Sequence, residues 1–310
     1  MQERFDSIRF QKYIFVLKTG CDAKLPLNKT SMFRGGAGEM LLRKHCLSDR
    51  NCEGCGFNDS CIVPNIYYHR FKIRPDFAQG KESEGYIFDC SDLREHFKAG
   101  DQLEFSLTLF GNVIVYFSTI MDAVYMLGQI GVGEENAHYD VVNIRNVNGE
   151  VIMKDNQVYL DHAAPLLLED YVDKRLRELD ASENDVRIRL KMLSPCSIKS
   201  KGELKYEFDP DALANSSYRR VYVLNCFEGN EMDQHYGKDS PIEILDQETR
   251  KVTVPRFSST HGKKLYLTGF VGEAEMKVKA EFLPYLIAGE ILHIGKNTSM
   301  GFGKYSLSVN

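Results

Sequence analysis

The chain has 310 residues, which is enough for one large or two ordinary domains with a substantial core. Hydrophobic residues make up 43% and charged residues 27%, which excludes a disordered or fibrous chain and indicates a folded, soluble protein. The formal net charge of −5 argues mildly against a polyanion partner, but basic residues outnumber acidic ones by nine to four between residues 250 and 310. The C-terminal part is therefore a candidate anion-binding half.

Two features of the sequence bear on its compartment. The N-terminus carries charges where a signal peptide needs an apolar run, and the uncharged stretch 105–121 holds five Ser, Thr or Asn residues, too polar for a membrane span. We therefore expect a cytoplasmic protein whose thiols stay reduced.

In the first half, residues 8–19 are rich in β-branched and aromatic residues and predict a strand. Apolar residues at helical spacing from Ser31 predict a helix, although its three glycines could instead mark a close approach of backbone. Strands are predicted over 66–73, 86–90 and 103–109, then a helix over 113–129 and a hairpin turning at Asn148-Gly149. An acidic helix over 167–179 would connect to the second half.

The second half repeats this order of elements. Strands are predicted over 186–192, 251–257, 263–279 and 305–309, and helices over 209–227 and 282–289. Each half then reads β-α-β-β-α-β, an α+β class fold, with a boundary near Asp185. We predict an N-terminal domain of residues 1–185, with an insertion at 46–61, and a C-terminal domain of residues 186–310.

The glycine-rich stretch GEILHIGKNTSMGFGKYSL lies between the last predicted helix and strand. Glycine permits positive φ angles, so successive backbone N–H groups could form a concave anion nest beside Lys296 and Lys304. The spacing is that of neither a Walker A loop nor a dinucleotide-binding motif, and a plain turn-rich loop is the alternative.

These residues carry a family resemblance. The C-terminal sequence LTGFVGEAEMK, followed by LPYLIAGEILHIGKNTSMGFGKYSL, resembles the ending of the CRISPR repeat-processing endoribonucleases of the RAMP superfamily. SPCSIKSKG, Tyr218-Arg219-Arg220 and PRFSS resemble the same C-terminal domain, and MFRGGAGEMLLRKHC with the spaced cysteines resembles the N-terminal part of one branch.

The resemblance implies tandem ferredoxin-like domains of the RAMP type and a pre-crRNA substrate. It also implies cleavage without a catalytic metal: a ribose 2′-hydroxyl attacks the adjacent phosphate and leaves a 2′,3′-cyclic phosphate and a 5′-hydroxyl. Such a reaction needs a base and an acid, for which histidine is suited near neutral pH. The resemblance favours a histidine near the end of the first helix, which selects His45, with His69 as second choice. His45 could instead be a metal ligand or a solvated helix end.

Four of the eight cysteines crowd into a C-x5-C-x2-C-x5-C cluster, namely Cys46, Cys52, Cys55 and Cys61. Four thiolates satisfy a tetrahedral structural zinc ion, and such a closed site leaves no open position for catalysis. An iron–sulfur cluster or a loop of free thiols are the alternatives.

The candidate RNA-binding residues combine cations with backbone glycines. They are Arg34, Lys199, Lys201, Arg219, Arg220, Arg256, Lys263, Lys264, Gly295, Lys296, Gly301, Gly303 and Lys304. Interleaved rings at Tyr218, Phe257, Tyr266 and Phe302 could stack unpaired bases, which is a common way to bind single-stranded RNA.

Two functions follow from these observations. The first is a metal-independent endoribonuclease that cleaves CRISPR repeat RNA with His45 as its acid–base residue. The alternative is a non-catalytic RAMP-type subunit that holds crRNA in a CRISPR effector complex, since fold alone does not separate the two.

Overall fold

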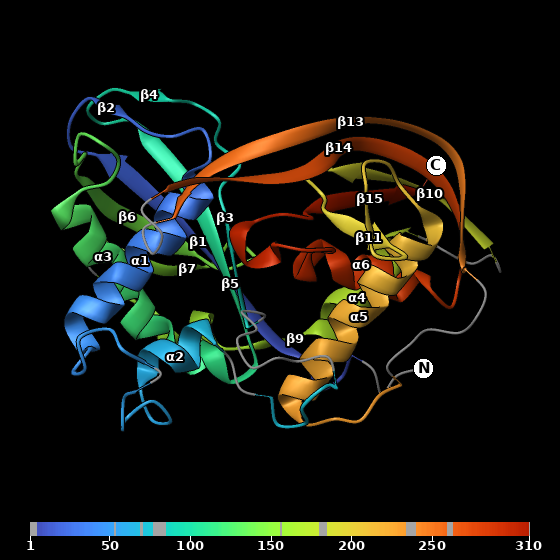
Figure 1. Ribbon diagram of the computed structural model, residues 1–310, viewed down its shortest axis with the longest axis horizontal. Helices are drawn as coiled ribbons and strands as arrows, with labels where there is room; N and C mark the ends of the chain where they lie inside the picture. The colour runs from blue at the N-terminus through green and yellow to red at the C-terminus, as the bar shows by residue number, and fades with distance from the viewer. Residues whose placement is uncertain are drawn as a thin grey trace.

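The computed structural model describes residues 5–52, 54–68, 71–76, 85–155, 157–179, 185–233, 240–258 and 263–309. Its strands form two main antiparallel sheets, each covered by helices (Figure 1). The N-terminal sheet consists of β1 (Arg9–Thr19), β3 (Tyr86–Asp89), β5 (Gln102–Phe110), β6 (Tyr139–Arg145), β7 (Val151–Lys154), β8 (Gln157–Val158) and β9 (Leu166–Leu167). The C-terminal sheet consists of β10 (Asp185–Met192), β13 (Ile242–Ser258), β14 (Lys263–Lys279) and β15 (Tyr305–Val309).

The helices and the small hairpins complete these elements. The helices are α1 (Lys29–His45), α2 (Ile62–Tyr67), α3 (Phe117–Ile130), α4 (Leu168–Leu179), α5 (Pro210–Glu228) and α6 (Leu283–Leu292). The short 3-10 helices are η2 (Gly111–Tyr116), η3 (Leu160–Ala163) and η4 (Thr298–Met300). Two further two-stranded sheets pair β2 (Ala23–Lys24) with β4 (His96–Phe97) and β11 (Ile198–Ser200) with β12 (Glu203–Lys205).

Both main sheets have the ferredoxin-like order. In the first, β6, β1, β5 and β3 lie side by side, and α1 and α3 join them in the chain order β-α-β-β-α-β. In the second, β15, β10, β14 and β13 repeat this arrangement with α5 and α6 as the two helices. The predicted tandem ferredoxin-like fold is therefore confirmed.

The local sequence explains most elements. Residues of β10 alternate between exposed and buried along the strand, as a sheet with one covered face requires. At the start of α5, the Asp209 carboxylate accepts a hydrogen bond from Ala212 N at 2.8 Å, which is an N-terminal cap. In α1, a Cβ added at Gly36 would lie 2.5 Å from Leu127 Cδ2, so this glycine lets α3 approach closely.

One predicted element is wrong. Residues 66–73 were expected to form a strand from their apolar and aromatic content, but α2 occupies Ile62–Tyr67 and no strand follows in the described residues 71–76. Pro64 lies within the first helical turn, where its missing N–H costs no intrahelical bond. Val63 and Ile66 are buried against the N-terminal core, so packing determines the conformation of this short segment.

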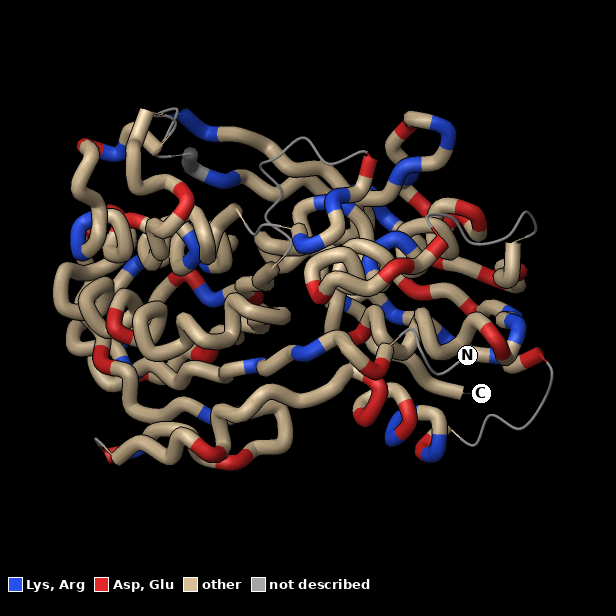
Figure 2. Tube along the Cα trace, turned by 90° about the horizontal axis from the view of Figure 1, so that it is seen from below, with Lys and Arg blue, Asp and Glu red and all other residues tan. Residues whose placement is uncertain are grey.

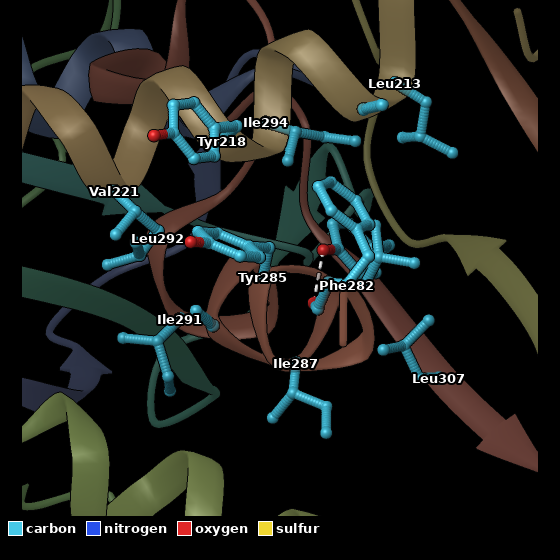
Figure 3. Close-up of a cluster of buried hydrophobic side chains, with 14 of the residues drawn as sticks. Leu213, Tyr218, Val221, Phe282, Tyr285, Ile287, Ile291, Leu292, Ile294 and Leu307 are labelled. Atoms are coloured by element: carbon cyan, nitrogen blue, oxygen red, sulfur yellow. Dashed lines mark hydrogen bonds between the residues drawn. The ribbon is translucent and has the colours of Figure 1, made fainter. Parts of the chain in front are cut away.

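The two cores are extensive, and the second includes residues from both ends of the chain. Figure 3 shows its centre, where side chains of α5 and α6 pack together around Tyr285 and Phe282. Helix α4 packs on α6, and its Leu168 and Val172 belong to this C-terminal core. By length and composition residues 111–130 could span a membrane, but the apolar face of α3 is buried in the N-terminal core, as in a globular domain.

The longest strands leave the second sheet and cross the first domain. Beyond its pairing with β10, β14 continues as a hairpin with β13 and is also bridged at Phe270 to Cys196. We call residues 249–258 and 263–272 the arm. Figure 1 shows the arm passing over α1 of the N-terminal domain, so elements of both domains border the same surface.

Candidate nucleic-acid interface

The glycine-rich segment, defined as residues 295–304, lies where the two domains meet. Its η4 turn contacts β3 and α1 of the first domain, and a Cβ added at Gly301 would lie 3.0 Å from Phe88 O. Lys304 at its end forms an ion pair with Asp89 of β3, Nζ to Oδ2 at 2.5 Å. The segment therefore joins the domains.

The glycine amides of this segment do not form the predicted anion nest. Its amide groups already donate within the protein, Gly295 N to Ser216 Oγ, Lys296 N to Ser197 O and Gly303 N to Pro195 O, each at 2.8 Å. Gly301 N likewise donates to Thr298 O at 2.8 Å. Because these donors are occupied, we assign the glycines to close packing, and any attraction for an anion here would come from cationic side chains.

Three of the predicted cations come together beside this segment. Lys199 of β11, Arg219 of α5 and Lys296 are exposed and near one another. Burial lowers the pKa of Lys296, and the positive charges of Lys199 and Arg219 lower it further. The charged form of Lys296 is thus disfavoured by its neighbours, and an anion bound here would relieve that repulsion.

The other exposed lysines among the predicted RNA contacts lie on the arm and on the β11–β12 hairpin. Lys263 and Lys264 are exposed on β14, and Lys201 is exposed in the turn between β11 and β12. Figure 2 shows basic positions near the end of the arm, whereas basic and acidic positions are mixed over much of the molecule.

Several residues that the sequence offered as RNA contacts belong to the interior. Arg220 is 5% exposed, and its Nε donates to Leu292 O at 2.9 Å while its guanidinium lies over the Phe110 ring. Tyr218 and Phe302 are each 2% exposed, so they pack in the protein rather than offer rings to bases. Adjacent residues of a helix point about 100° apart, which explains why Arg219 is exposed and Arg220 is not.

The structure adds one cation that sequence analysis missed. Lys12 of β1 is half-buried near Lys304 and Asp89, and burial, followed by the charge of Lys304, lowers its pKa. A lysine in the middle of a central strand flanked by buried residues was the available signal.

His45, the predicted acid–base residue, is the last residue of α1 and borders a cavity of ≈ 350 Å³. Its Nε2 atom is buried and has no hydrogen-bond partner among the described residues. Arg34 lies eleven residues earlier, so at 3.6 residues per turn both side chains project from the same face of α1, roughly 16 Å apart along its axis. The second choice, His69, lies outside the described residues.

The same cavity is bordered by the four clustered cysteines, Cys46, Cys52, Cys55 and Cys61. Within the described part of the chain, no three Cys, His, Asp or Glu side chains are arranged to hold a metal ion. The Cys46 sulfur instead accepts a hydrogen bond from Arg50 N at 3.1 Å. The four thiols therefore line one cavity, but they are not positioned around a common point as metal ligands would be. Structural zinc stays a prediction.

Comparison with protein families identifies both halves. Residues 8–166 match a family of N-terminal domains named AF_1859_N, and residues 190–305 match the model of the CRISPR-associated endoribonuclease Cas6. The second match runs from β10 to β15 and includes the whole glycine-rich segment. The chain belongs to the Cas6 family of CRISPR-associated endoribonucleases. The resemblance seen in the sequence is therefore confirmed.

Solved structures of Cas6 proteins share the fold at low sequence identity. A partial Cas6-RT-Cas1–Cas2 complex matches with a TM-score of 0.58 at 14% identity, over 98% of this chain and 46% of that chain. Thermus thermophilus Cas6 matches with a TM-score of 0.50 at 13% identity, over 97% of this chain and 98% of that chain. A Cas6 product complex matches with a TM-score of 0.51 at 13% identity, over 96% and 99%.

The chain thus spans less than half the length of the first of these proteins, and nearly the full length of the other two. A comparison with curated proteins found no match.

Proposed function

We propose that this Cas6-family protein binds CRISPR repeat RNA along the surface shared by its two domains and cleaves it there. Family membership supports CRISPR RNA as the substrate. The clustering of Lys199, Arg219 and Lys296 supports a surface that attracts its phosphates.

The proposed reaction needs no metal. A base takes the proton of a ribose 2′-hydroxyl, O2′ attacks the adjacent phosphorus, and the bond from phosphorus to O5′ breaks. An acid gives O5′ a proton, so the products carry a 2′,3′-cyclic phosphate and a 5′-hydroxyl. Nearby cations stabilise the additional negative charge of the phosphorane.

We assign the acid–base role to His45, and one observation carries this assignment. Its Nε2 atom lacks a partner among the described residues, so it is not committed to a hydrogen bond there, and RNA binding would have to uncover this buried atom. His45 and Arg34 project from the same face of α1. An RNA strand that follows this face could therefore place its reacting phosphate at His45 and another phosphate at Arg34.

A second candidate function is supported by the surroundings of the same histidine. His45 shares its cavity with the four cysteines rather than with the cations of the C-terminal domain. If the His45 imidazole acts together with these cysteines and not in RNA cleavage, the protein is a crRNA-binding subunit that does not cleave. CRISPR effector proteins would then be its partners.

Cleavage of the repeat RNA of the protein's own locus separates the two functions. The parent protein, His45→Ala and His138→Ala would be incubated with the RNA in EDTA, and mass spectrometry would define the product ends. His138 is exposed on the first domain and serves as a matched control. We expect His45→Ala to lose about 10²- to 10⁴-fold in rate, with binding retained.

Other outcomes would contradict parts of the proposal. Equal cleavage by the parent and His45→Ala would remove His45 from the reaction and direct the search to His69. Tight binding without cleavage by any of the proteins would favour the crRNA-binding subunit. Open 2′- or 3′-phosphates formed directly would exclude attack by the 2′-hydroxyl.

A further inference from the structure

Two arginines from different domains meet beneath the arm. Arg34 lies on α1, and its Nε donates to Tyr86 OH at 3.0 Å. Its guanidinium carbon lies 5.6 Å from the ring centroids of both Tyr67 and Tyr86, so two rings fix its orientation. Arg256 approaches from β13, where it contacts Met300 of η4, and η4 in turn contacts both α1 and β3. The charge of Arg34 also contributes, after burial, to lowering the pKa of Arg256.

The contacts of Arg256 are unusual for an arginine. Its Nη1 approaches the Met300 sulfur at 3.3 Å, while its Nε is buried without a hydrogen-bond partner among the described residues. A thioether is a weak acceptor and brings no negative charge. Within the described part of the chain, Arg256 is therefore held at the glycine-rich segment with most of its hydrogen-bonding capacity unused.

Neither arginine has a carboxylate partner among the residues that the structure describes. Ion pairs among the described residues neutralise many other arginines, such as Arg189, whose Nη2 lies 2.5 Å from Glu275, but none includes Arg34 or Arg256. Burial, followed by the charge of Arg34, lowers the pKa of Arg256, so the positive charge of Arg256 carries a cost. The pKa of Arg34 is lowered by burial but raised overall by Tyr86 and Tyr67. An anion bound between them would remove this cost.

We propose that Arg34 and Arg256 together bind one phosphodiester group of the RNA strand and thereby fasten the arm to α1. The guanidinium fork matches a phosphate bidentately, and two forks can share its non-bridging oxygens. The proposal deepens the proposed function, from which it takes RNA as the ligand. It goes further in assigning one phosphate to a pair of residues that belong to different domains.

The surroundings favour an RNA backbone over an isolated anion. Exposed Lys263 and Lys264 lie on the strand paired with Arg256, and Lys264 pairs with the residue that follows it. A strand held between the two arginines can therefore continue along the arm past further cations. His45 lies farther along the same face of α1, so the bound phosphate would position the chain relative to that histidine.

The test measures binding of repeat RNA made uncleavable by a 2′-deoxy substitution at the scissile nucleotide. Arg34→Gln, Arg256→Gln and the double variant would be compared with the parent across a salt titration. Each single variant should lose about tenfold in affinity, as for a charge-assisted hydrogen bond. The fold-loss of affinity in the double variant should be much smaller than the product of the two single fold-losses. The magnitude of its slope of log K against log salt should decrease by about 0.7, the value for one phosphate.

Two controls keep the test interpretable. Arg189→Gln removes an arginine that is already neutralised by Glu275 and should bind RNA as the parent does. Arg256→Lys keeps the charge but not the fork, so it should preserve the salt slope and lose affinity. Thermal unfolding of each variant would show that its fold is intact.

Every outcome bears on the proposal. Losses that multiply in the double variant would mean two independent phosphates and overturn the shared site, as would unchanged affinity in both single variants. Cleavage of ordinary RNA by the parent in either case would leave the proposed function standing. Coupled losses without any cleavage would support the arginine pair and contradict the nuclease. Failure of the parent to bind RNA would overturn both.

Discussion

The structure predicts that alanine at Gly303 is far more costly than alanine at another glycine of similar backbone conformation. Gly303 has φ +75°, and a Cβ added there would lie 1.8 Å from Ile294 O. Its own N–H donates to Pro195 O at 2.8 Å, and its carbonyl accepts from Ile294 N at 3.1 Å. The substituted residue could not move away without breaking these bonds.

The magnitude follows from two parts. A left-handed conformation costs an L-residue about 1–2 kcal/mol. The collision with Ile294 O requires a shift of the backbone, and overpacking of this kind typically costs about 1–3 kcal/mol. We expect Gly303→Ala to lower the free energy of unfolding by about 2–5 kcal/mol.

Gly149 provides the matched comparison. It has φ +83° in the hairpin between β6 and β7, and a Cβ added there meets nothing within 4 Å. Gly149→Ala should therefore cost only the conformational part, about 1–2 kcal/mol. Urea denaturation followed by circular dichroism would measure both variants. Equal losses of stability would refute the packing role assigned to Gly303, and a loss of RNA binding with unchanged stability would restore the anion nest.

Three further predictions concern protonation, packing and metal. Burial lowers the pKa of His293 to about 3, whereas an unfolded histidine has a pKa of about 6.5, so the unfolded chain binds the proton first. The contribution of His293 to the free energy of unfolding is complete above pH 6.5. Below pH 6.5 it decreases by at most about 1.4 kcal/mol per pH unit. Urea denaturation at pH 7, 6 and 5 should therefore show that the free energy of unfolding depends less steeply on pH in His293→Asn than in the parent. Leu213→Ala removes a fully buried side chain and should cost about 2–5 kcal/mol in the same assay, and a loss below 1 kcal/mol would contradict its place in the core. If the cysteine cluster binds zinc, atomic emission should find about one zinc per chain in the parent and in Cys21→Ser but less in Cys55→Ser, while no zinc in the parent would reject the site.

Much of the fold was predictable because burial follows strand and helix periods. The alternation in residues 186–192 and the Asp209-Pro210 start of the long helix each led to the correct element. The error over residues 66–73 arose because a short apolar segment suits either a strand or a helix, and only its packing against the N-terminal core decides.

The candidate site was less predictable, because a residue type does not reveal which way its side chain points. Arg219 and Arg220 are equally good candidates in the sequence, although one is exposed and the other buried. Arg34 and Arg256 are separate candidates there, since nothing in the sequence shows that residues 222 positions apart approach each other. The glycines were correctly singled out, but for anion binding rather than for the close packing that the structure assigns to them.

The arm also acts as a lever. Beyond the bridge from Phe270 to Cys196, about seven residues of each strand extend from the C-terminal domain, which at about 3.3 Å per residue is roughly 23 Å. A tilt of only 5° at this point would therefore displace the far end by about 2 Å, roughly two thirds of the length of a hydrogen bond. Small angular changes in one domain are thus amplified into larger changes of position over the other, and the accuracy with which the proposed RNA ligand would be placed depends on the stiffness of a two-stranded ribbon.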